Sequence, residues 1–196
     1  MHGFDEASRF KNKFEIVVIG GSAGSFPVVN RMLEKINPAF KLPIAMCLHR
    51  LKDKREGFKE ALEIKSVLPV VEPNDKDFIE PGKVFIAPAN YHLLIENKER
   101  FALAVTELIQ YSRPSIDVLF DSCADVFGHT ALSIVLSGAN KDGAFGVKRI
   151  KKKGGFVIVQ DPQECSMTTM PEAAINAVEP DMILPSMKIV EFLNRL

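Results

Sequence analysis

A continuous apolar run that ends in a glycine-rich turn most restricts how this chain can fold. Residues 16–19 are all apolar, and three glycines and a serine follow within residues 20–24. A half-exposed strand alternates polar and apolar side chains, whereas a parallel strand buried on both faces does not. The glycines permit a sharp turn out of the sheet, and Pro27 fits the first turn of a helix over roughly residues 26–36. The sequence therefore predicts an α/β fold that begins with a buried strand, a turn and a helix.

Two later segments repeat this pattern. Apolar runs at residues 43–48 and 131–136 read as buried strands, and the second leads through a polar turn into a helix over roughly residues 144–153. Residues 91–96 and 101–106 flank an Asn-Lys turn, which is typical of a hairpin. We predict a mainly parallel, doubly wound sheet with helices on both faces and a small antiparallel β-hairpin insertion.

The remaining segments fill out this sheet. Extended runs and turn residues predict further strands, and apolar periodicity and cap residues predict further helices, with Ser186 as the cap of the last one. The predicted strands are 67–72, 83–87 and 156–160, and the predicted helices are 54–64, 115–127, 171–177 and 186–196.

Three polar residues follow the three main predicted strands. Gly20-x-Ser22-x-Gly24 is the nucleophile-turn pattern of several hydrolases, in the strand–turn–helix context that it requires. His49 ends the second strand, and Asp142 lies in the turn after the third. The carboxyl ends of parallel strands meet at one edge of the sheet, so these residues would supply a nucleophile, a base and a base-orienting carboxylate. Asp142 could instead cap the helix that follows it.

A nucleotide site is the first alternative, because glycine-rich turns after a first strand often bind phosphate. The Gly-x-Gly-x-x-Gly pattern fails, since Ser22 and Ser25 occupy its second and third glycine positions. The second strand ends in His49-Arg50 instead of an acidic residue for the ribose. Arg50 could contact the extra phosphate of NADP, so an NADP-like nucleotide-binding protein stays open as an alternative.

Composition favours a cytoplasmic protein with a single core. The chain has 196 residues, 46% of them hydrophobic, and its 25 basic side chains balance 25 acidic ones. We therefore expect no field that would hold nucleic acid or an anionic membrane. No apolar run approaches the ~20 residues that span a bilayer. The three cysteines have neither metal nor redox spacing, so we expect no metal and no cofactor.

Five short sequence motifs follow one another along the chain. They are Gly20-Gly21-Ser22-Ala23-Gly24, the strand-ending His49, Arg113-Pro114-Ser115-Ile116-Asp117-Val118-Leu119-Phe120, Leu136-Ser137-Gly138-x-x-x-Asp142-Gly143-Ala144-x-Gly146 and Met170-Pro171-x-x-Ala174-Ile175. Together they resemble the catalytic domain of the chemotaxis protein-glutamate methylesterases, the CheB family. The resemblance extends from about residue 14 to the C-terminus.

The resemblance implies roles for particular residues. Ser22 would be the nucleophile, His49 the general base and Asp142 the carboxylate that orients it. Backbone N–H groups of Ala139 and Ala23 would receive the oxyanion. The order Ser22, His49, Asp142 disfavours a general esterase of the α/β-hydrolase type, in which histidine comes last.

Two further residues are candidates for substrate binding. Arg113 could approach a substrate carboxylate or anchor its own loop. Met170 could pack against a substrate or seal its helix against the sheet.

The resemblance also implies an activity and partners. The expected reaction is hydrolysis of methyl esters on glutamyl side chains of chemoreceptor cytoplasmic helices, with deamidation of glutamine as a second activity. A non-catalytic receptor-binding module is the alternative.

We expect residues 1–13 to form a tail and residues 14–196 a single catalytic domain, without the family's usual receiver domain. A separate regulatory or receiver protein is therefore a candidate partner. Ser25 and Asn140-Lys141 depart from the family's common residues, so the oxyanion loop is expected to differ in detail.

Overall fold

The central sheet confirms the predicted α/β class. The structure is a computed structural model that describes residues 10, 12–49 and 57–196. In these residues seven strands form one sheet in which every pairing is parallel. From edge to edge the strands are β3 (Val70–Val71), β4 (Val84–Ile86), β2 (Ile44–Leu48), β1 (Ile16–Gly21), β7 (Ala131–Val135), β8 (Phe156–Gln160) and β9 (Met182–Leu184).

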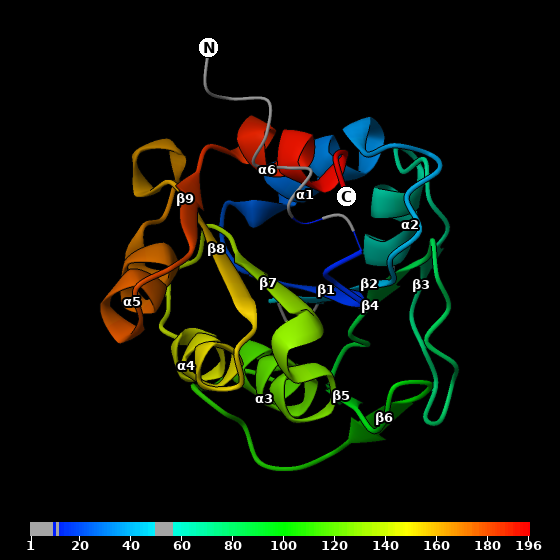
Figure 1. The fold of residues 1–196 in the computed structure, drawn as a ribbon. Helices are drawn as coiled ribbons and strands as arrows, with labels where there is room; N and C mark the ends of the chain where they lie inside the picture. The colour runs from blue at the N-terminus through cyan, green and yellow to red at the C-terminus, as the bar shows by residue number, and fades with distance from the viewer. Residues whose placement is uncertain (1–9, 11, 50–56) are drawn as a thin grey trace.

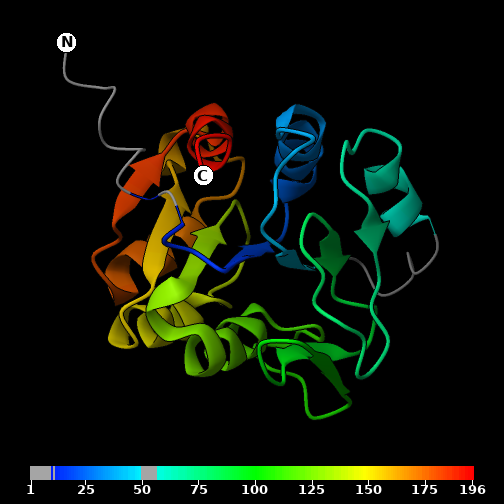
Figure 2. The same ribbon diagram turned by 45° about the vertical axis from the view of Figure 1, so that its right-hand side comes forward.

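Helices cover both faces of this sheet, as predicted (Figures 1 and 2). One face carries α1 (Ser25–Lys35), α2 (Phe58–Glu63) and α6 (Ser186–Leu193). The other carries α3 (Ile116–Phe127), α4 (Ala144–Lys152) and α5 (Thr169–Ala177). The predicted hairpin is a separate antiparallel pair, β5 (His92–Ile95) and β6 (Phe101–Ala104), which packs beside α3. Short 3₁₀ turns lie at Gly128–Thr130 and Pro162–Glu164.

Strand β1 shows why its sequence lacks alternation. All six of its residues are buried. Val17 and Ile19 point into the core beneath α1 and α6, whereas Ile16 and Val18 point into the core beneath α3. Successive side chains of a strand point to opposite faces, so a strand between two helical layers must be apolar at every position.

The strand order changes direction at β1. From β1 the chain passes to β2 on one side, and it later returns to β7 on the other side of β1. Ligands of open α/β sheets bind beyond the carboxyl ends of the strands at such a switch of direction. The turns after β1, β2 and β7 meet there.

The helix boundaries agree with the predicted ones to within a few residues, but one predicted N-cap residue is wrong. Ser186 was expected to cap the last helix, but it is the first helical residue, and its N–H donates to the Glu164 carboxylate at 2.8 Å. The cap therefore comes from a residue 22 positions earlier in the chain. The predicted helix at 54–64 begins at Phe58 in the described part of the chain, and residues 50–56 lie outside that part. None of the helices described is both long and apolar enough to cross a membrane.

Candidate active site

Ser22 lies directly after β1 in a turn that is held from two sides. Its N–H donates to the carbonyl of Ser137, 2.9 Å away in the loop after β7. Its own carbonyl accepts from the N–H and Oγ of Ser25 at 3.0 and 2.7 Å. Gly24 has φ 83°, and a Cβ there would lie 1.7 Å from the Oγ of Ser166. The turn therefore requires glycine at position 24, and it leaves Ser22 half exposed.

His49 follows β2 and lies beside Ser22 in the register of the sheet. Gly21 pairs with Leu48, and the N–H of His49 donates to the carbonyl of Gly21 at 3.0 Å. The next residue along each strand is Ser22 on one side and His49 on the other. The imidazole is 11% exposed, and its Nε2 lies 2.8 Å from the Oδ2 of Asp142. The structure thus brings the three predicted residues to one edge of the sheet.

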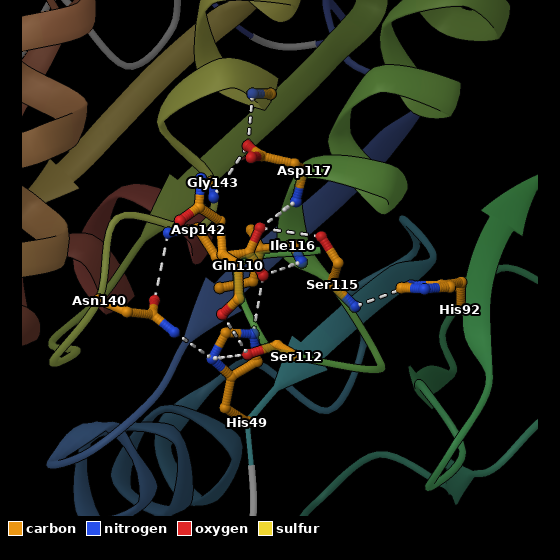
Figure 3. Close-up of polar contacts among 11 residues, drawn as sticks. His49, His92, Gln110, Ser112, Ser115, Ile116, Asp117, Asn140, Asp142 and Gly143 are labelled. Carbon is orange, nitrogen blue, oxygen red and sulfur yellow. Dashed lines mark hydrogen bonds and ion pairs between the residues drawn. The ribbon is translucent and has the colours of Figure 1, made fainter. Parts of the chain in front are cut away.

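The second imidazole nitrogen of His49 faces two polar side chains, as Figure 3 shows. The Nδ1 atom lies 3.2 Å from the amide nitrogen of Asn140 and 3.5 Å from the Oγ of Ser112. The amide of Asn140 is oriented by its oxygen, which accepts from the N–H of Asp142 at 3.2 Å. Because Nε2 donates to a carboxylate and Nδ1 accepts from an amide, the proton is on Nε2, and Nδ1 carries the lone pair that can accept a proton.

Direct contact between the serine and the imidazole is not part of this structure. Among the hydrogen bonds of the residues described, none joins the Oγ of Ser22 to His49. Hydrogen bonds between a nucleophile and its base are often long without substrate and tighten in the complex. In this structure the amide nitrogen of Asn140 lies nearer to Nδ1, at 3.2 Å, than the Oγ of Ser112 does.

Asp142 is fully buried and accepts four hydrogen bonds. Besides Nε2 of His49, the donors are the Oγ of Ser115 at 2.9 Å and the N–H groups of Ile116 and Asp117 at 2.7 and 2.9 Å. Burial by itself raises the pKa of Asp142, but the bonds from His49 and from these N–H groups hold it below its ordinary value. The carboxylate therefore stays ionised beside the imidazole.

The helix that Asp142 caps is not the one that follows it. The alternative prediction placed it as the cap of the helix beginning near residue 144, but that position belongs to Gly143, with φ 96°. The side chain instead binds the first N–H groups of α3, some 25 residues earlier in the chain. The start of α3 thus acts as the partner of Asp142, because free N–H groups at a helix N-terminus favour a negative charge.

Asp117, in the first turn of α3, makes the equivalent interaction with the start of α4. Its Oδ1 accepts from the N–H groups of Gly143 and Gly146 at 2.9 and 2.7 Å. Burial, together with the nearby charge of Asp142, raises the pKa of Asp117 to about 6 although these N–H groups oppose the rise. Sequence reasoning gave no role to Asp117, Ser115 or Ser112. The first two lie within a family motif, which was the available signal.

An Asp117→Asn protein is expected to be more stable than wild type at pH 7. The folded pKa of about 6 exceeds the ordinary value of 3.8, so the contribution of Asp117 to stability is lost as the pH rises through this window. An asparagine oxygen keeps both bonds to α4 without charge. The gain should be about 2 kcal/mol, because the raised pKa corresponds to about 3 kcal/mol and losing the charge at a helix start costs about 1 kcal/mol. Urea unfolding from pH 4 to 7 measures the difference, and a variant less stable than wild type at pH 7 contradicts the expectation.

The two predicted oxyanion donors lie in the turns after β1 and β7. Ala23 and Ala139 are both exposed, and in the described part of the chain neither N–H has a protein acceptor. The loop of Ala139 is fixed by Gly138, whose N–H donates to Met167 and whose carbonyl accepts from Met170, at 3.1 and 3.0 Å. Two unpaired N–H groups on fixed loops are available to an oxyanion.

The two predicted substrate-binding side chains both contact other parts of the protein. The guanidinium of Arg113 donates to the carbonyl of Thr106 at 2.6 Å, which anchors its own loop. Met170 is 1% exposed and packs against Gly138, so it seals α5 against the sheet. Met167, in the loop before α5, is 39% exposed. Arg50, on which the nucleotide alternative depends, lies outside the described residues.

Comparisons with known proteins identify the family and the fold. The family model described as CheB methylesterase matches residues 17–193. The chain belongs to the CheB methylesterase family. The crystal structure of the CheB methylesterase catalytic domain of Thermotoga maritima superposes with a TM-score of 0.87 at 31% identity, and it covers 92% of this chain and 97% of that one. The resemblance stated from the sequence motifs is therefore confirmed.

Two relatives differ in how much of their length this CheB-family chain spans. The protein-glutamate methylesterase/protein-glutamine glutaminase of Trichodesmium erythraeum is 36% identical over 186 residues, which are 93% of this chain and 53% of that protein. A protein of Leptospira interrogans, provisionally named for the same two activities, is 39% identical over 184 residues, 93% of this chain and 95% of that one. The match therefore includes a relative of nearly the same length.

Proposed function

We propose that this protein is a protein-glutamate methylesterase that acts through Ser22, His49 and Asp142. The observation that carries the proposal is the 2.8 Å contact between the buried Asp142 carboxylate and Nε2 of His49, next to the Ser22 turn, in a chain of the CheB methylesterase family. A buried carboxylate on one imidazole nitrogen leaves the other nitrogen as a base, and Ser22 and His49 follow neighbouring strands at the same edge of the sheet.

In the proposed first step, Ser22 attacks the ester carbonyl of a methylated glutamyl side chain. The hydroxyl proton passes to Nδ1 of His49, and the Asp142 carboxylate stabilises the imidazolium through Nε2–H. The N–H groups of Ala23 and Ala139 receive the oxyanion. When the tetrahedral intermediate collapses, the methoxy group leaves with the proton from His49 as methanol, and a glutamyl–serine ester remains.

In the second step, His49 takes a proton from water, which attacks the glutamyl–serine ester. The ester bond to Ser22 breaks, the serine recovers its proton from His49, and a free glutamate side chain is released. The same groups can act on glutamine, in which case ammonia leaves in place of methanol. This supports a second activity as a glutaminase, consistent with the paired name of the Trichodesmium relative.

The proposed substrates are methylated segments of chemoreceptor cytoplasmic helices, because the family acts in chemotaxis signalling. The protein would then work in the cytoplasm, and residues 14–196 would form one catalytic domain. A separate regulatory or receiver protein remains a candidate partner. Cofactor and metal have no role in the proposed steps.

Purified protein incubated with methyl-esterified receptor fragments is expected to release methanol, and with glutamine-bearing fragments ammonia. Both products are followed over time against a no-enzyme control. Saturable binding of the fragments with neither product released would favour the receptor-binding module. Tight, saturable binding of NADP would favour the nucleotide alternative. Either result overturns the proposed function.

A further inference from the structure

A second histidine, His92, is buried in the network that holds Asp142. It is fully buried on β5, and it lies on the far side of Ser115 from Asp142 in Figure 3. None of the catalytic steps above uses it. A buried imidazole with two ring nitrogens needs a hydrogen-bond partner for each, so its contacts specify what it does.

Both nitrogens of His92 contact the backbone. The N–H of Ser115 donates to Nδ1 at 3.2 Å, and Nε2 lies 3.0 Å from the carbonyl oxygen of Glu107. A backbone N–H can only donate and a carbonyl can only accept, so the proton of His92 is on Nε2. The protein therefore holds this imidazole in a single tautomer and orientation.

His92 joins two segments, one of which contacts Asp142 and the other His49. Ser115 donates through its Oγ to Asp142 at 2.9 Å, and the two residues after it donate through their N–H groups. Glu107 belongs to the segment before α3, in which Ser112 lies 3.5 Å from Nδ1 of His49. His92 thus fixes one segment that binds the carboxylate and another that lies against the base.

We propose that His92 is a positioning residue, which acts through Ser115 to keep the Asp142 carboxylate aligned with Nε2 of His49. For catalysis this inference rests on the proposed function. Groups that orient a catalytic side chain commonly affect activity 10- to 100-fold without touching substrate, as the outer partners of metal ligands do. The competing interpretation is that His92 only packs the hairpin against α3.

The test compares two substitutions that each keep half of the histidine contacts. Asparagine has an oxygen near the position of Nδ1, so His92→Asn keeps an acceptor for the N–H of Ser115. Glutamine places its amide near the position of Nε2, so His92→Gln keeps a donor for Glu107 and loses the acceptor. His129→Asn is the matched control, because His129 is exposed.

Two readouts separate positioning from packing. The first needs no substrate: it is the downfield NMR resonance of the His49 Nε2–H proton that binds Asp142, assigned by single substitutions of the four histidines. The second is the pH profile of kcat and KM. We expect His92→Gln to broaden or shift the resonance and to lower kcat about 10- to 100-fold with KM nearly unchanged. His92→Asn should retain most of both, and His129→Asn should match wild type.

The inference is overturned if His92→Asn loses more activity than His92→Gln. It is also overturned if the His49 resonance is unchanged in a folded His92→Gln protein. An equal loss in both variants also overturns it, since packing and not the Ser115 acceptor would then be responsible. A wild-type protein that releases neither methanol nor ammonia would contradict the proposed function instead. In that case the resonance still decides whether His92 positions Asp142 and His49.

Discussion

A Ser22→Ala protein is expected to lose about 10⁴- to 10⁶-fold in methanol release while its stability stays unchanged. The loss follows because no acyl-enzyme can form without the hydroxyl. The stability should hold because Ser22 is half exposed, and its contacts in the described residues are made by its backbone N–H and carbonyl. Such surface substitutions usually change the free energy of unfolding by about 0.5 kcal/mol or less. Steady-state turnover and urea unfolding, measured on the same preparation, check both parts.

Ser66→Ala is the matched control for this substitution. Ser66 precedes β3, so it lies toward the opposite edge of the sheet from the site, and its Oγ donates only locally to the carbonyl of Leu68. It should release methanol at the wild-type rate. If Ser22→Ala kept more than about a hundredth of wild-type turnover, another group would have to be the nucleophile.

The position of the candidate site could be predicted from the sequence, because strand direction alone determines it. Three apolar runs predicted three parallel strands, and parallel strands bring the residues after them to one edge. Ser22, His49 and Asp142 therefore converge whatever the details of helix packing. The hairpin was also predicted, since two extended segments around a short turn depend on local sequence only.

The partners of Asp142 could not be predicted in the same way, because they depend on how closely two helices approach. Asp142 reaches the start of α3 only because α3 and α4 pack tightly, where a Cβ on Gly146 would lie 2.5 Å from Phe120. Apolar periodicity shows which face of a helix is buried, but not which neighbour it meets or at what distance. The local rule that aspartate caps the next helix therefore pointed to the wrong helix.

This arrangement joins catalysis to folding in one pair of side chains. Asp142 caps α3 and binds His49, while Asp117 caps α4 from α3. The two carboxylates hold two helix starts together, and the geometry of the base depends on both. The Ser22 side chain takes no part in these contacts. Substitutions of Ser22 and of Asp142 should therefore differ in their effects on turnover and on stability.

Asp142→Asn is therefore expected to lose both activity and stability. Four donors converge on the carboxylate oxygens, but an amide has only one oxygen, so its NH₂ must face two of them. If the NH₂ faces His49, the imidazole proton moves to Nδ1 and the base nitrogen is lost. We expect turnover to fall about 10⁴-fold, as in other triads. The free energy of unfolding should fall by about 2 kcal/mol or more, because each buried donor left without an acceptor costs about 1–3 kcal/mol.

Asp125→Asn is the control, because Asp125 is about half exposed and pairs with Arg149 and Lys153 at 2.9 Å on the surface. It should keep full turnover and lose less than about 1 kcal/mol. Turnover and urea unfolding of both variants distinguish the roles of Asp142. A protein that lost stability but retained wild-type turnover would show that Asp142 only caps α3, and one that lost turnover alone would show that the cap contributes little. The combined loss is the result that a shared carboxylate requires, because the same oxygens orient the base and satisfy the start of the helix.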